Sequence, residues 1–74
     1  MALDKQQAAK LKNFGGKVRR VRVSRNVTQE QLAELADLNI RTVQKIEAGH
    51  INILLTTVLR IKESLRCDWK QLLG

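Results

Sequence analysis

The sequence has no proline and no tyrosine, and it has a single cysteine and a single histidine. One cysteine, Cys67, excludes a disulfide within the chain. Cys67 and His50 together provide two of the four ligands that a structural zinc ion requires. Neither residue has a visible partner for nucleophilic or acid–base chemistry, and Gly15-Gly16 is not a phosphate-binding loop. We therefore expect no enzymatic activity, no metal and no cofactor.

Long apolar runs are also missing, because no stretch approaches the roughly 20 residues of a membrane-spanning helix. The segment from Met1 to Lys12 carries charges where a signal peptide would need apolar residues. These two absences predict a cytoplasmic protein. A chain of 74 residues forms one domain and buries only about 60% of its unfolded surface. Its core is therefore small, and a partner subunit is the remaining means of stabilising it.

Positive charge is abundant and unevenly distributed. The chain has 14 Lys and Arg against 7 Asp and Glu, a net charge of +7. Residues 1–25 contain eight basic residues and one acidic residue, whereas residues 26–74 contain six of each. Such a concentration of charge predicts a polyanionic partner. Aromatic residues are only 3%, too few to stack the bases of a single strand. Duplex DNA fits best, with a membrane surface bound through residues 3–25 as the minor alternative.

Apolar residues recur at helical spacing nearly throughout the chain, and no segment alternates as a strand does. The expected fold class is all-α, with five short helices in a compact repressor-type domain. Each glycine of Gly15-Gly16 costs about 1 kcal/mol relative to alanine, so we start the first helix at Phe14 and treat residues 4–13 as its N-terminal extension. The predicted helices cover residues 14–25, 29–36, 40–48, 55–65 and 69–73.

Polar residues and glycine mark the ends of these helices. Thr28 and Gln31 form a capping box at the start of the second helix. Asp37 tolerates the left-handed backbone that a tight turn requires. Asn39 is an N-cap candidate for the third helix, and Gly49 terminates that helix.

The third helix has two different sides at 100° per residue. Val43 and Ile46 lie on one side and predict a buried face. The other side carries the residues that we predict to contact base edges: Ile40, Arg41, Gln44 and Lys45. Arginine can bind guanine and glutamine can bind adenine with two hydrogen bonds each, and an aliphatic side chain can touch a thymine methyl. The spacing alone is equally compatible with an ordinary solvated face.

Two sequence segments at a fixed separation resemble a known family. Residues 28–33 read Thr-Gln-Glu-Gln-Leu-Ala, and residues 42–49 read Thr-Val-Gln-Lys-Ile-Glu-Ala-Gly. With Val18, Arg19 and Arg22 ahead of them, they resemble the helix-turn-helix family of phage repressors, Cro proteins and restriction–modification controller proteins. The resemblance covers residues 14–73. It departs at Asp37, where the family usually has glycine, and at Leu54, where it usually has serine or threonine.

The resemblance implies roles for further residues. It implies a DNA-binding helix-turn-helix domain over residues 14–74, preceded by a basic extension of residues 1–13. It also implies a structural ion pair between Arg22 and Glu47, because a carboxylate near the buried side of the third helix needs a partner. The predicted phosphate-contacting residues are Thr28, Gln29, Lys17, Arg19, Asn52 and His50.

The function expected from these observations is sequence-specific binding of double-stranded DNA by a transcription regulator, without a small-molecule ligand. A phage-type repressor and a restriction–modification controller are both compatible with the sequence, and an antitoxin-type protein-interaction module is the alternative. A homodimer on a two-fold symmetric operator is expected. Its predicted interface comprises Trp69, Leu72, Leu73, Leu54 and Leu55. In the competing interpretation, Trp69 closes the core of a monomer.

Overall fold

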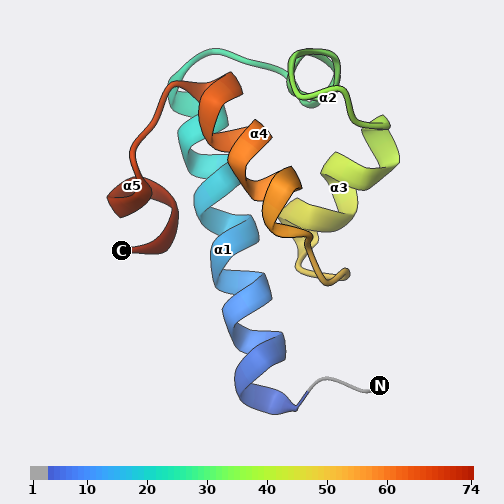
Figure 1. The fold of residues 1–74 in the computed structure, drawn as a ribbon, viewed down its shortest axis with the longest axis vertical. Coiled ribbons are helices and arrows are strands. Elements are labelled where there is room, and N and C mark those ends of the chain that lie inside the picture. The colour runs from blue at the N-terminus through green and yellow to red at the C-terminus, as the bar shows by residue number, and fades with distance from the viewer. Residues whose placement is uncertain (1–3) are drawn as a thin grey trace.

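The computed structural model describes residues 4–74, which form five helices (Figure 1). The helices are α1 (Lys5–Ser24), α2 (Gln29–Leu35), α3 (Ile40–Ala48), α4 (Leu55–Leu65) and α5 (Trp69–Leu73). The predicted all-α fold is confirmed, and apart from the start of α1 the helix ends differ from the prediction by at most one residue. None of these helices is both long and apolar enough to cross a membrane.

Helix α1 is longer and more regular than predicted. It runs without a break from Lys5 to Ser24, through both glycines and across the predicted domain boundary after residue 13. The interruption that the cost of two neighbouring glycines suggested is therefore absent, and residues 5–13 are the N-terminal extension of the same helix. A capping box begins the helix: the Gln7 amide donates to Asp4 Oδ1 at 2.7 Å, and the Asp4 amide donates to Gln7 Oε1 at 3.4 Å. An aspartate three residues before a glutamine is the sequence signal of this capping box.

Close contact with α3 explains why a glycine stands in the middle of α1. A Cβ atom added to Gly15 would overlap the backbone of α3, where it would lie 2.7 Å from the carbonyl oxygen of Glu47. Gly49, which ends α3 with a positive φ of 74°, also lies close to α1, since an added Cβ would be 2.5 Å from the Cα atom of Lys12. The backbones of the two helices therefore touch at two points.

The core lies where α1 contacts α3, α4 and α5. Figure 1 shows α1 at the centre, with α2 and α3 to one side and α5 to the other. The largest fully buried side chains are Leu32, Ile46, Ile61, Leu65, Leu72, Val18 and Val43. Leu72 is thus part of the core, and its predicted place in a subunit interface is wrong. Its neighbour Leu73, by contrast, is exposed.

Burial also determines the state of the single cysteine. Cys67 is a buried residue, and burial raises the pKa of its thiol above the ordinary value. Burial opposes the nearby charge of Arg25, which acts in the other direction. The thiol is therefore protonated at neutral pH and serves as a small apolar core residue. Among residues 4–74, no three His, Cys, Asp or Glu residues form a group that could hold a metal ion.

The predicted caps and turns of the two central helices are confirmed. The Gln31 amide donates to Thr28 Oγ1 at 3.0 Å, and the Thr28 amide donates to Gln31 Oε1 at 2.9 Å. Asp37 has a φ of 55°, in the left-handed region. The Arg41 amide donates to Asn39 Oδ1 at 2.8 Å, which caps α3. These local features define where α2 begins, where the chain turns after it and where α3 begins.

The two neighbouring glycines of α1 should respond in opposite ways to alanine. Gly15→Ala should lower the free energy of unfolding by about 1–3 kcal/mol, because the added methyl overlaps the α3 backbone. Gly16→Ala should raise it by about 0.4–1 kcal/mol, because no atom lies within 4 Å of the new methyl. Urea unfolding measures both. Equal effects of the two substitutions would contradict the close approach of α1 and α3.

Candidate nucleic-acid interface

Helix α3 presents one polar face to solvent. Val43 and Ile46 are buried, whereas Arg41, Gln44 and Lys45 are exposed. The exposed face forms a shallow depression lined by Arg41, Gln44, Lys45, Ala48 and His50. Ala48 was absent from the predicted site, although the helical spacing of the sequence already places it on this face. The lining thus combines long donor side chains with one small methyl group.

Ile40 lies at the margin of this face. Its side chain is half-buried and packs against the core. Only part of the residue is therefore available to a ligand at the exposed face. Of the four predicted base-contacting residues, the structure places Arg41, Gln44 and Lys45 together, with Ile40 at the edge.

An ion pair holds α3 to α1. Arg22 Nε lies 2.6 Å from Glu47 Oε2, and Arg22 Nη2 lies 3.1 Å from Glu47 Oε1. The two side chains are only 11% and 4% exposed. The predicted ion pair is therefore present, and it is bidentate and largely buried. Arg22 Nη1 also donates to the Val27 carbonyl oxygen at 2.9 Å, so the same guanidinium fixes the turn before α2.

Gln29 joins this network from the first turn of α2. Its Nε2 atom donates to Glu47 Oε1 at 3.1 Å. The amide nitrogen carries two hydrogens, so one remains for another acceptor. Thr28 and Gln29 also line a shallow depression between the end of α1 and the start of α2, together with Arg22 and Glu30. The structure thus places both predicted phosphate contacts beside the ion pair.

The basic residues of α1 point in different directions. Lys17 and Arg19 are two positions apart, so their directions differ by about 160° around the helix. Arg19 is exposed and follows the side on which Gly15 and Arg22 meet α3. Lys17 is half-buried and shares its side with Lys10, which lines a groove beside α5. The structure therefore does not bring the two predicted contacts together.

Arg25 has a structural role that the charge pattern did not reveal. Its Nε atom donates to the carbonyl oxygen of Leu65 at 3.0 Å, and its Nη2 atom donates to that of Arg66 at 3.3 Å. These carbonyl groups lie at the C-terminus of α4, where a cation is favourable. Part of the basic segment therefore stabilises the fold.

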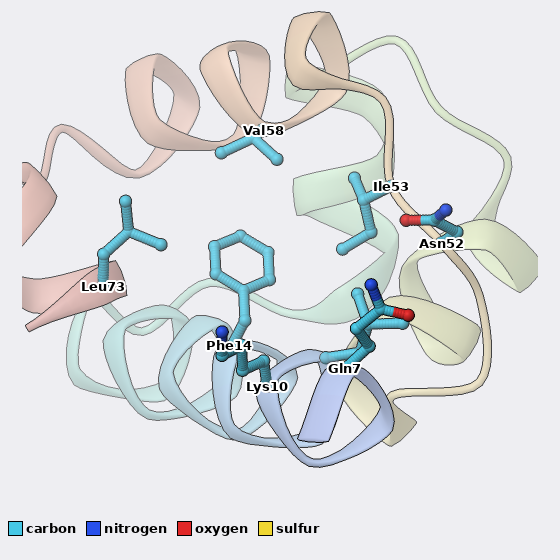
Figure 2. A pocket seen from close by; sticks show the side chains of 8 residues that line it. Gln7, Lys10, Phe14, Asn52, Ile53, Val58 and Leu73 are labelled. Atoms are coloured by element: carbon cyan, nitrogen blue, oxygen red, sulfur yellow. The ribbon is translucent and has the colours of Figure 1, made fainter. Parts of the chain in front are cut away.

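The loop after α3 is divided between two surfaces. His50 lies in the depression on the exposed face of α3. Asn52 instead lines a groove of about 340 Å³ that is also lined by Gln7, Lys10 and Leu73 (Figure 2). The two predicted loop contacts therefore face different neighbours, although only one residue separates them.

A helix, a short turn and a second helix with a free polar face form a helix-turn-helix DNA-binding unit. The helix-turn-helix family model matches residues 18–72. The chain therefore belongs to the helix-turn-helix family, as its sequence motifs predicted.

A solved structure is also similar over most of the chain. It is the restriction-modification controller protein C.AhdI from Aeromonas hydrophila, with a TM-score of 0.82 and 31% sequence identity. The similarity covers 86% of this chain and 97% of that chain. No curated protein sequence matches the chain.

Removal of the buried carboxylate tests the importance of the ion pair. Glu47→Ala leaves Arg22 and Gln29 without their shared acceptor, so we expect a loss of about 3–5 kcal/mol in the free energy of unfolding. Glu34→Ala removes an exposed carboxylate from α2 and should change stability by less than about 0.5 kcal/mol. Urea unfolding compares the two. Similar small effects would show that the pair contributes little.

Proposed function

We propose that this protein is a sequence-specific, double-stranded DNA-binding transcription regulator whose helix α3 enters the major groove. The observation that carries the proposal is the exposed polar face of a helix whose opposite face is buried in the core. The major groove is about 12 Å wide and admits an α-helix. Membership of the helix-turn-helix family supports this use of α3.

The side chains on this face suit the edges of base pairs. Arg41 and Lys45 can donate to the O6 and N7 atoms of guanine, and Gln44 can bind the N6 and N7 atoms of adenine. The methyl group of Ala48 and the exposed part of Ile40 can contact a thymine methyl. His50 closes the same depression and can donate to a phosphate beside the groove.

Helix α1 crosses the C-terminal turn of α3, where Glu47 and Gly49 are only two residues apart. In one direction α1 leads through Arg22 to Thr28 and Gln29, and in the other direction its residue Lys12 lies beside Gly49. We call these two sides the first and the second flank of the exposed face of α3. We propose that Thr28 and Gln29 contact phosphates on the first flank. His50 contacts them on the second, while Arg19 between the flanks adds to the positive field.

The controller role is the more specific part of the proposal. C.AhdI is named as a restriction-modification controller protein, and the likeness extends over most of both chains. We propose that this chain, too, controls a restriction–modification system. A search of the DNA upstream of its own gene for an inverted repeat would provide the candidate operator.

Substitutions on α3 test base recognition. Arg41→Ala and Gln44→Ala should each weaken binding to a selected DNA site by about 1–3 kcal/mol and relax the preference at one base position. Arg60→Ala, an exposed position on α4, serves as the control and should leave the preferred sequence unchanged. Binding to selected and random duplexes separates the effects. An equal loss on both duplexes would show that Arg41 and Gln44 contact only phosphates.

We also propose that the protein acts as a homodimer, because one α3 helix reads only a few base pairs. Exposed apolar side chains beside the groove of Figure 2 support this proposal. Leu73 lines the groove together with Ile53 and Val58. Leu54 and Leu55, which follow Ile53 in the chain, are strongly exposed. Trp69 is partly exposed, with the ammonium group of Lys62 5.3 Å from its ring centre.

A matched pair of leucines tests the dimer. Leu73 and Leu35 are both 61% exposed, but Leu35 lies on α2, away from the groove. Leu73→Glu should convert the dimer into a folded monomer with weaker DNA binding, whereas Leu35→Glu should remain dimeric. Sedimentation at micromolar concentration measures the state of association. A wild-type protein that remains monomeric at high concentration, and binds one half-site as well as two, would contradict the proposal.

A further inference from the structure

The first two turns of α1 form a helix that the core does not require. Every residue from Lys5 to Lys10 is exposed. The family match begins only at residue 18, so this segment lies outside the common helix-turn-helix unit. The segment is nevertheless an ordered part of α1, with a complete capping box at Asp4 and Gln7. A well-formed helical segment without a buried face indicates that its exposed surface interacts with a ligand.

Two lysines of this segment share one side of the helix. Lys5 and Lys12 are seven residues apart, so their directions differ by only about 20° and their positions by about 10 Å along the axis. Arg19, a further seven residues on, continues the same line. Both lysines are exposed, and no acidic side chain within residues 4–74 forms an ion pair with either of them. Their charges are therefore available to a ligand.

This line of charges lies on the side of α1 that faces α3. The backbone of Lys12 contacts Gly49, which ends α3. The next residue, His50, lies in the depression on the exposed face of α3. Lys12 is thus beside the second flank of the proposed groove contact. Figure 1 shows the N-terminal part of α1 continuing past α3. Lys5 is the first residue of α1, about 10 Å farther along the helix axis than Lys12.

We propose that Lys5 and Lys12 form a phosphate-binding ridge that extends the DNA contact beyond the groove occupied by α3. This inference rests on the proposed function. The first flank already has hydrogen-bond donors in Thr28 and Gln29. The ridge supplies the second flank with two full positive charges. The ligand is the sugar–phosphate backbone, so the ridge adds affinity but does not read sequence.

Two exposed arginines of other parts of the chain provide a matched control. Arg60 on α4 and Arg66 after α4 also carry two charges, and neither side chain takes part in the proposed DNA contact. The test compares Lys5→Gln/Lys12→Gln with Arg60→Gln/Arg66→Gln. Both double variants lower the net charge of +7 by the same amount. Circular dichroism and sedimentation check that helix content and association are unchanged.

The measurement is the affinity for a short random-sequence duplex between 50 and 200 mM salt, by fluorescence anisotropy. Loss of two phosphate contacts should reduce the slope of log K against log salt by about 1.8 per bound subunit. The affinity ratio across this salt range then becomes about 12-fold smaller. We expect this change for Lys5→Gln/Lys12→Gln only.

Two outcomes would overturn the inference in different ways. If both double variants keep the wild-type slope, or both reduce it equally, the ridge has no specific contact while the proposed DNA-binding function stands. If the wild-type protein itself shows no salt-dependent affinity for duplex DNA, the proposed function fails and the ridge fails with it.

Discussion

The contact between α1 and α3 is the constraint on which the rest of the structure depends. Gly15 and Gly49 allow the two backbones to touch, and the buried Arg22–Glu47 pair joins the helices beside these contacts. The same carboxylate accepts from Gln29, and the same guanidinium donates to the turn before α2. One charged pair therefore orients three helices. In a domain of 74 residues, whose core is small, such a contact determines how rigidly α3 is held.

This arrangement gives α3 a fixed face and places charge around it. Because Val43 and Ile46 are buried and Glu47 is held by Arg22, α3 cannot rotate without breaking core packing and the ion pair. The neighbouring α1 and its C-cap residue Arg25 carry eight of the 14 basic residues, but these residues have different roles. Arg22 and Arg25 stabilise the fold, whereas the exposed lysines remain available to an anion. The net charge alone would therefore overestimate the number of groups that can contact DNA.

Local signals in the sequence were sufficient to predict most of the fold. The capping box of Thr28, the turn at Asp37 and the end of α3 at Gly49 depend on neighbours within a few residues, so the sequence shows them directly. The glycine at position 15 cannot be explained from its neighbours in the sequence, because it is required by a contact with α3, about 30 residues away in the chain. Leu72 and Leu73 have the same residue type, and only the packing of α5 determines which of them is buried. Arg22 and Glu47 were paired through the family resemblance, since nothing local connects them.

The most direct test of the account is methylation interference on a DNA site selected from a random pool. Dimethyl sulfate modifies guanine N7 in the major groove and adenine N3 in the minor groove. If α3 enters the major groove, methylation of guanine N7 should block binding at two half-sites about 34 Å apart. Interference confined to adenine N3, or none at either atom, would contradict the central role of the exposed face of α3.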